Sequence, residues 1–406
     1  MQKSILFVDD EENILKGLKR MLHRYSKEWF MLFAVGGDEA LEIMKQCKIE
    51  VLVTDMKMPK MSGVELMKEV KRLYPDVIRI VLSGHSEKED VIKSVSLAHQ
   101  YLAKPCPPDK LIDIINNTYI LNTILKSQEV KRTISTIDSL PTLPETYYAL
   151  MDELNNPEFS LKRVGEIISD DIGMSTSILK QVNSSFWGLP NPVSTPEQAV
   201  SMLGGDIVKA LVLSTHLFDL GKDVDTDLIP IEELEFQSKL TGRYSKLICE
   251  KLNLPKEVRD FSFIASILQD VGRLVLASNF PDTYSVVMEN AAKNPEWALK
   301  YAEYTVMGVT HAEVGAYLLG IWGIHNDVVI SVAVHHTPRS VFNKEDKVCR
   351  VSYLAGAIAE LLIKNDFATV DELDIDNEYL VEFGVKEILP ELFEEAVNIF
   401  LEVKDV

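Results

Sequence analysis

A short apolar segment that ends in a single carboxylate constrains the fold of this chain more than any other feature. Val51 to Thr54 are apolar or β-branched, and they are followed by Asp55 and then by Pro59 and Gly63. Such a run bounded by turn-forming residues predicts a buried strand of a parallel sheet. Because ligands of open α/β sheets bind just beyond the carboxyl ends of the strands, we expect Asp55 to lie at a functional position.

The first 125 residues alternate between strand-like and helix-like patterns. The expected strands are residues 4–8, 30–35, 51–54, 79–82 and 100–102. The expected helices, recognised by apolar residues at helical spacing, are residues 12–23, 37–46, 63–73, 87–98 and 108–125. Five strand–helix repeats predict a doubly wound, five-stranded parallel α/β sheet with right-handed crossovers.

Polar residues stand where the predicted strands end. The first strand is followed by Asp9 and Asp10, the third by Asp55, the fourth by Ser83 and the fifth by Lys104. These ends meet at one edge of the sheet, where clustered carboxylates repel one another unless a hard cation such as Mg²⁺ joins them. A hydroxyl and an ammonium are suited to hold phosphoryl oxygens. The set therefore predicts a carboxylate that accepts a phosphoryl group with metal assistance.

These residues resemble the receiver domain of bacterial two-component response regulators, across residues 1–125. The resemblance implies a flavodoxin-like fold and makes Asp55 the phosphorylated aspartate, with a cognate histidine kinase or a small phosphodonor as partner. It also implies that Mg²⁺ is held by Asp9, Asp10 and Asp55, with the backbone carbonyl of Lys57 as a further ligand.

The same resemblance assigns residues to the switch that follows phosphorylation. Ser83 matches the switch hydroxyl of the family, Lys104 matches the lysine of its active site, and Tyr101 matches its switch aromatic residue. The face formed by the fourth helix, the fifth strand and the fifth helix is expected to repack, and it is a candidate homodimer interface. An aromatic residue in a short strand is also an ordinary packing residue, so both roles stay open for Tyr101.

Helical patterns dominate the rest of the chain. Residues 126–139 are expected to form a helical linker, and a proline-containing break follows at 140–144. The expected helices beyond it include residues 145–154, 161–169, 173–183, 196–203, 206–217 and 351–362. We therefore expect an all-α domain over residues 140–406, with a core at 140–340 and C-terminal helices at 341–406.

A series of short motifs in this region occurs in a specific order. They are LPTLP at 140–144, ISDD at 168–171, LKQVNS at 179–184, AVSMLG at 199–204, LQDVG at 268–272, HAEVG at 311–315 and HHTP at 335–338. Together they resemble the HDOD domain, a divergent, HD-like branch of the HD superfamily of metal-dependent phosphohydrolases. The order of the motifs carries the resemblance, since no single motif is specific.

The residues that an HD metal site requires are mostly replaced. A catalytic HD site combines a histidine, a His-Asp pair and a distal aspartate, which hold a divalent ion that activates water. Gln237 replaces the first histidine, Gln269 the histidine of the pair and Gly356 the distal aspartate, which leaves Asp270. We therefore expect no metal in the helical domain and a non-catalytic, protein-interaction output.

Three histidines in this region keep other interpretations open. His311, His335 and His336 stand where the cyclic-dinucleotide phosphodiesterase branch uses additional histidines, although its Gly-Tyr-Pro signature is missing. Adjacent helical residues point about 100° apart, so at most one of His335 and His336 is expected to face the site. The favoured interpretation is a satisfied polar cluster of Asp270, the two glutamines, His311 and one of these histidines. A small-ligand pocket and a receiver-regulated, metal-dependent phosphodiesterase are the alternatives.

Charge and hydropathy argue against some classes of function. Residues 1–125 contain 18 basic and 18 acidic residues, so the whole net charge of −20 lies in residues 126–406. Nucleic-acid binding normally needs a basic surface, so we expect no direct nucleic-acid contact. The sequence shows no apolar run of about 18 residues, no signal-peptide pattern and no metal-type cysteine spacing. We expect a cytoplasmic protein without membrane contact, and a downstream protein partner that the sequence does not identify.

Overall fold

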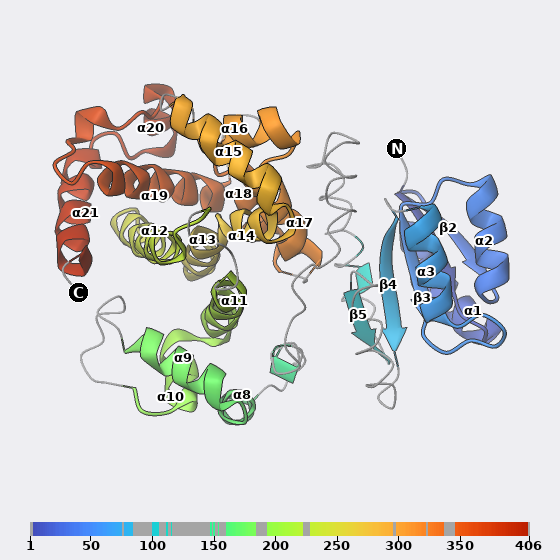
Figure 1. Cartoon of the computed structure of the whole chain (residues 1–406). Coiled ribbons are helices and arrows are strands. Elements are labelled where there is room, and N and C mark those ends of the chain that lie inside the picture. Colours follow the sequence, from blue (N-terminus) through green and yellow to red (C-terminus); the bar gives the residue numbers. More distant parts are fainter. Residues whose placement is uncertain are drawn as a thin grey trace. The chain divides into compact units, whose positions relative to one another are not determined.

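The structure is a computed structural model of the 406-residue chain (Figure 1). The chain divides into two compact units, with the main boundary in the sequence between Thr142 and Leu143. The described residues are 3–74, 77–83, 100–104, 111–112, 115, 147, 149–150, 153, 160–183, 193–221, 228–294, 298–321, 324–336 and 346–404. The expected helix at 87–98 and linker at 126–139 lie outside these residues, as do most of the expected helices at 108–125 and 145–154.

A five-stranded parallel sheet forms the first unit, in the order β2-β1-β3-β4-β5. The strands are β1 (Lys3–Val8), β2 (Trp29–Ala34), β3 (Val51–Asp55), β4 (Ile78–Ser83) and β5 (Gln100–Ala103). The strand order reverses between β1 and β3, which places the ends of these two strands at the switch point where α/β sheets bind ligands. The predicted fold class is confirmed for this unit.

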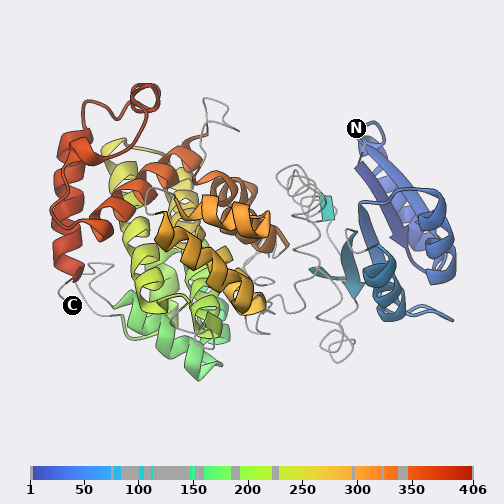
Figure 2. The same cartoon turned by 45° about the horizontal axis from the view of Figure 1, so that its top comes forward.

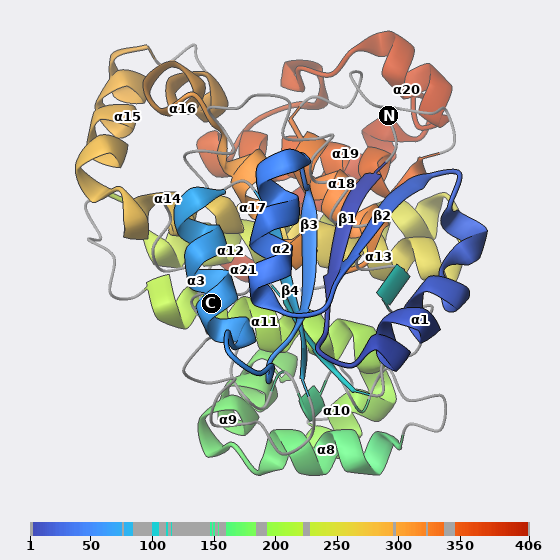
Figure 3. The ribbon, with the colours of Figure 1, turned by 90° about the vertical axis from the view of Figure 1, so that its right-hand side faces the viewer.

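Helices cover both faces of the sheet because successive strand residues point to opposite faces. α1 (Glu12–Met21) packs on the face that receives Phe7, and a short 3₁₀ turn follows it. α2 (Gly37–Gln46) and α3 (Gly63–Leu73) pack on the face that receives Leu6, and they lie side by side in Figure 3. The buried strand β3 lies between these two layers.

The second unit consists of helices and connecting turns in its described residues (Figure 2). The helices are α8 (Leu161–Ser169), α9 (Ile172–Val182), α10 (Pro196–Leu203), α11 (Gly205–Gly221), α12 (Ile231–Lys251), α13 (Lys256–Leu268), α14 (Val271–Asn279), α15 (Pro281–Lys293), α16 (Leu299–Met307), α17 (His311–Ile321), α18 (Asn326–Val334), α19 (Lys347–Lys364), α20 (Asn377–Phe383) and α21 (Leu389–Lys404). This confirms the predicted all-α class.

The C-terminal helices share a hydrophobic core with α12. Tyr244 of α12 is buried in this core, and its hydroxyl donates a hydrogen bond of 3.0 Å to the carbonyl oxygen of Ala396 in α21. Leu354 and Ile358 of α19 lie in the same core. The helices beyond residue 340 therefore pack as part of the helical unit.

Among the described residues, one helical stretch has the length and composition of a membrane span. It covers Lys256–Asn279, and 83% of its most apolar window is buried in the structure. Such burial is the environment of a core helix, so this stretch gives only weak support for a membrane span.

Candidate functional site

Three of the predicted residues meet at the carboxyl end of the sheet. Asp9 follows β1, Asp55 ends β3 and Lys104 follows β5. The Lys104 ammonium donates a hydrogen bond of 2.8 Å to Asp9 Oδ2 and a second, shorter one to Asp55 Oδ1. The sheet topology thus places one ammonium between two carboxylates from separate strands.

The two carboxylates of this group are buried, and burial shifts the pKa values of Asp55 and Lys104. Asp9 is 2% exposed and Asp55 is 8% exposed. Burial raises the pKa of Asp55, and the hydrogen bond from Lys104 opposes this shift without cancelling it. Burial lowers the pKa of Lys104, but the hydrogen bonds to Asp55 and Asp9 outweigh it and raise the pKa. Two buried carboxylates that share one cation favour the binding of a further cation.

The segment after β3 holds the Asp55 carboxylate in place. The backbone N–H of Lys57 donates a hydrogen bond of 3.0 Å to Asp55 Oδ2. Ser62 and Glu65 then form a capping box that starts α3, with each side chain accepting from the other's backbone N–H. A Cβ atom at Gly63 would overlap the carbonyl oxygen of Asp55, so the close approach of α3 to β3 requires glycine.

The structure places the other predicted residues of this site by their backbone. Asp10 follows Asp9 and is half-buried. Ser83 ends β4, and Tyr101 lies in β5 in register with Val81 of β4. The side chains of Ser83 and Tyr101 lie outside the described residues. Lys57 stands two residues after Asp55, at the same edge of the sheet.

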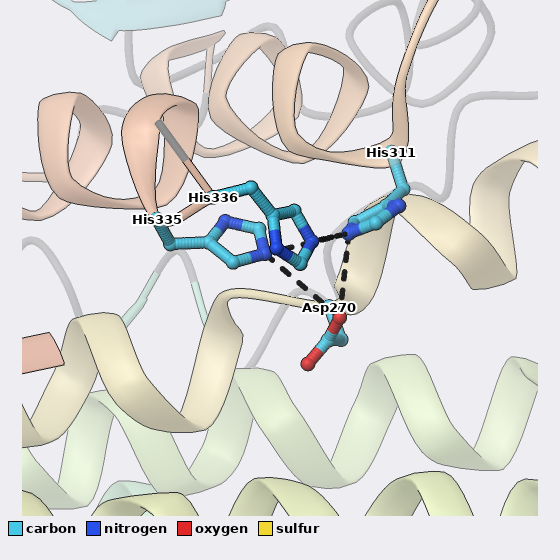
Figure 4. A group of neighbouring side chains, drawn as sticks. All are labelled: Asp270, His311, His335 and His336. Carbon is cyan, nitrogen blue, oxygen red and sulfur yellow. Dashed lines mark hydrogen bonds and ion pairs between the residues drawn. The ribbon is translucent and has the colours of Figure 1, made fainter. Parts of the chain in front are cut away.

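A second group of ionisable side chains lies inside the helical unit (Figure 4). Asp270 joins α13 to α14, His311 begins α17, and His335 and His336 follow α18. We call these four residues the histidine cluster; one potential ligand atom of each lies within 4.8 Å of the others. The Nε2 atom of His311 is 3.4 Å from Asp270 Oδ1, 3.4 Å from His335 Nε2 and 2.9 Å from His336 Nε2.

The prediction that at most one of His335 and His336 faces this site is wrong. α18 ends at Val334, so both histidines lie in a turn and not on a continuing helix. The helical angle of about 100° between adjacent side chains does not apply in a turn. Both rings therefore point toward His311 (Figure 4).

The residues that replace HD ligands surround Asp270. The Nε2 atoms of Gln237 and Gln269 donate hydrogen bonds of 3.4 and 3.1 Å to Asp270 Oδ2. A Cβ atom at Gly356 would lie 3.2 Å from Gln269 Nε2. The buried Oε1 atom of Gln269 has no hydrogen-bond partner among the described residues, so the cluster is not fully satisfied. The expectation that this region binds no metal is not confirmed, because four side chains able to bind a metal converge here.

Three residues around the cluster were missed by sequence analysis. Glu303 of α16 accepts hydrogen bonds from His311 Nδ1 at 2.6 Å and from His311 N–H at 2.9 Å. The hydroxyl of Tyr284 donates to Glu303 Oε1 at 3.1 Å. Burial lowers the pKa of Arg273, but Tyr284, Asp270 and Glu303 outweigh it and raise the pKa. No local pattern marks these residues, since they reach the cluster only through tertiary packing.

Burial and neighbouring charges shift the pKa values of the three histidines in different directions. Burial lowers the pKa of His335 to about 4 and holds the pKa of His336 well below its ordinary value. Burial also lowers the pKa of His311, but the Glu303 carboxylate outweighs it and raises the pKa. His335 and His336 are therefore neutral at pH 7, and each offers a ring-nitrogen lone pair.

Comparison with known families accounts for both units. The model of the response regulator receiver domain matches residues 5–116, and that of the HDOD domain matches residues 140–338. The chain is a response regulator with a receiver domain and an HDOD domain. Asp55 and Lys104 thus lie in a domain of the phosphorylation-controlled type, whereas the histidine cluster lies in the HDOD domain.

The chain is similar to known proteins over part of its length. The hydrogenase transcriptional regulatory protein HoxA of Cupriavidus necator is 38% identical over 116 residues, 28% of this chain and 23% of the relative. An HDOD domain protein of unknown function from Geobacter sulfurreducens has a TM-score of 0.54 at 21% identity, with 68% of this chain and 97% of that chain covered.

A second structural neighbour has a similar fold. A putative phosphohydrolase from Shewanella amazonensis has a TM-score of 0.53 at 22% identity, with 66% of this chain and 93% of that chain covered. The match to HoxA spans about a quarter of that protein's length. At these identities the two structural neighbours show the fold alone.

Proposed function

We propose that Asp55 accepts a phosphoryl group from a histidine kinase or a small phosphodonor and thereby controls a non-catalytic HDOD domain. The observation that carries this proposal is the pair of hydrogen bonds from Lys104 to Asp9 and Asp55. A buried carboxylate at a strand end, beside a second carboxylate and an ammonium, combines a nucleophile with charges that can hold phosphoryl oxygens.

The donor set at this edge suits Mg²⁺. Asp9, Asp10 and Asp55 offer carboxylate oxygens and the Lys57 carbonyl offers a neutral one, which are the hard ligands that Mg²⁺ prefers. Asp9 Oδ1 accepts one hydrogen bond, of 2.9 Å from Glu11 N–H, and keeps a second lone pair. When bound, Mg²⁺ supplies positive charge that offsets the charge of the phosphoryl oxygens.

The residues of this chain then perform the transfer and the switch. The Asp55 carboxylate attacks the phosphorus atom, a bond from oxygen to phosphorus forms, and the bond to the donor's leaving group breaks. Lys104 already contacts Asp55, so a small displacement brings it to a phosphoryl oxygen, where Ser83 contributes a hydroxyl and Tyr101 follows inward. Changing a mostly inactive population into a mostly active one needs about 5.5 kcal/mol. Two or three charge-assisted contacts of about 1.5–3 kcal/mol each would supply it.

The HDOD domain acts as a protein-binding output in this proposal. Gln237, Gln269 and Gly356 stand at three of the four positions that a catalytic HD site requires, and none of them offers an ionisable ligand. We place the protein in the cytoplasm, with domains at 1–125 and 140–406 joined by a linker at 126–139. A homodimer through the face of the fourth helix, fifth strand and fifth helix belongs to the same proposal.

A metal-dependent phosphodiesterase acting on cyclic dinucleotides is the second candidate. The histidine cluster is the observation that favours it, because imidazole and carboxylate ligands hold catalytic divalent ions in hydrolases. Full-length protein supplied with Mn²⁺ or Fe²⁺ is expected to leave cyclic di-nucleotides intact. Multiple turnovers that disappear in His311→Gln would establish the hydrolase instead.

Phosphorylation of Asp55 is tested by labelling with acetyl phosphate in the presence of Mg²⁺. Wild-type protein is expected to gain an acid-stable, base-labile acyl phosphate, and Asp55→Asn is expected to gain none because the amide cannot attack phosphorus. Asp38→Asn, which removes an exposed carboxylate in α2, is the matched control and is expected to label normally. Equal labelling of Asp55→Asn would refute the assignment.

A further inference from the structure

Hydrogen bonds fix which nitrogen of two clustered histidines carries the proton. His311 Nδ1 is 2.6 Å from a carboxylate oxygen of Glu303, and His335 Nδ1 is 2.6 Å from the carbonyl oxygen of Val332. Both oxygens accept hydrogen bonds and cannot donate them, so both Nδ1 atoms carry hydrogen. In a neutral ring the other nitrogen, Nε2, is then a bare acceptor.

These acceptors point at one another inside the domain. The Nε2 atoms of His311 and His335 are 3.4 Å apart, and they lie 3.4 and 4.0 Å from Asp270 Oδ1 (Figure 4). His336 Nε2 lies 2.9 Å from His311 Nε2. A proton on one nitrogen satisfies only one of these contacts and leaves the other acceptors facing each other in a buried site. A cation at the centre of the cluster satisfies all of them together.

We propose that Asp270, His311, His335 and His336 bind one divalent transition-metal ion, such as Zn²⁺, in a closed site with four protein ligands. Zinc binds imidazole nitrogen and carboxylate oxygen at about 2.0–2.2 Å, which places tetrahedral ligand atoms about 3.4 Å from one another. The spacings of 3.4, 3.4 and 4.0 Å match that geometry with small adjustments, and the spacing of 2.9 Å widens on binding.

The surroundings orient the ligands toward the proposed ion. Glu303 fixes the ring of His311 and makes its Nε2 more basic, the arrangement in which a carboxylate supports a metal-binding histidine. Tyr284 holds Glu303 in turn. The two glutamines occupy only Asp270 Oδ2, which leaves Oδ1 for the metal. Gln237 and Gln269, which stand at replaced HD positions, therefore orient Asp270 and do not themselves bind the metal.

The ligand count separates this site from a catalytic one. A hydrolytic zinc ion has three protein ligands and keeps a position open for water, whereas four protein ligands close a structural site. The four ligands also come from three separate places in the chain: the α13–α14 junction, the start of α17 and the turn after α18. One ion thus ties these segments together and stabilises the fold without activating water.

Metal content of the full-length protein tests the proposal directly. Purified protein, stripped with a chelator, is titrated with Zn²⁺ in excess Mg²⁺ so that the receiver site is occupied. We expect one tightly bound Zn²⁺ per chain and a higher melting temperature of the HDOD transition, since a ligand that binds only the folded state stabilises it. Co²⁺ in place of Zn²⁺ is expected to give the intense visible absorption of a tetrahedral complex. A chain that binds neither ion under these conditions would overturn the site.

Variants assign the metal to these residues. His336→Ala, at the least buried ligand, is expected to abolish the tetrahedral Co²⁺ spectrum, and His325→Ala, at an exposed histidine outside the cluster, is expected to leave it unchanged. Glu303→Gln keeps all four ligands and is expected to weaken Zn²⁺ binding about 10- to 100-fold. If His336→Ala and Glu303→Gln both bind as the wild type does, the ion lies elsewhere. Asp55→Asn labelling is independent of all these outcomes.

Discussion

Half-buried lysines in the two domains differ in the direction of their pKa shifts. Lys104 is held by two carboxylates that outweigh the effect of burial and raise its pKa. Lys246 of α12 lies with its ammonium 4.5 Å from the centre of the Phe263 ring. There burial dominates over the charges of Glu250 and Asp260 and lowers the pKa of Lys246 to about 8. A charged lysine in that position costs stability at neutral pH.

The Lys246 pKa predicts a pH-dependent stability. Between pH 8 and 10.5 the unfolded chain binds more protons at this residue than the folded chain, so the free energy of unfolding rises with pH. Lys246→Met removes the buried charge, and we expect it to stabilise the protein by roughly 1–3 kcal/mol at pH 7 and by less at pH 9.5. Urea denaturation at both pH values measures this difference. The exposed Lys256→Met is the control, and an equal effect of Lys246→Met at both pH values would contradict the prediction.

At the scale of elements, the start of α3 is coupled to the strand β3. The capping box of Ser62 and Glu65 fixes where α3 begins, and Gly63 lets that beginning approach the backbone of Asp55. The Gly63 N–H also donates a hydrogen bond of 2.9 Å to the carbonyl oxygen of Met56. The loop between β3 and α3 is therefore held at both ends, which fixes the backbone that follows Asp55.

Substitution of Gly63 tests this coupling. Gly63→Ala would place a methyl group against the Asp55 carbonyl, and we expect a loss of about 1–3 kcal/mol of unfolding free energy and slower labelling of Asp55. Gly17→Ala is the matched control. Nothing lies within 4 Å of a Cβ atom at Gly17 in α1, so that variant is expected to gain about 0.5–1 kcal/mol. Chemical denaturation measures both, and a neutral effect of Gly63→Ala would argue against the close approach.

At the scale of the whole molecule, charge is divided unevenly along the chain. The receiver region is balanced, and residues 126–406 carry the entire net charge of −20. An acidic surface repels the phosphate backbone of nucleic acids and attracts basic protein surfaces. The acidic region at 126–406 is therefore better suited to a basic protein surface than to DNA.

Direct DNA binding is the property that this charge distribution argues against. We expect no retardation of duplex DNA by the unphosphorylated or phosphorylated full-length protein in a low-salt gel shift. Low salt favours phosphate contacts, so it is the most permissive condition. A retarded band that fades as salt is added would contradict the expectation and would point to a local basic surface.

Local patterns were enough to predict several helices of both domains and the strand ends that form the receiver site. The bounds of α2, α3, α8 and α10 agree with the predicted helices, because apolar periodicity is a property of neighbouring residues. Capping side chains also mark the starts of α3, α8 and α10. The positions of Asp9, Asp55 and Lys104 followed from parallel topology, since the carboxyl ends of parallel strands meet at one edge.

What the sequence determined by itself was therefore the order of elements, the two domain classes and the candidate phosphoacceptor. Tertiary structure alone decided the character of the histidine cluster. The end of α18 turns both His335 and His336 inward, and packing of α16 brings Glu303 onto His311. The hydrogen bonds that orient these rings form only after the helices have packed. They join residues far apart in the sequence, so no local periodicity predicts them.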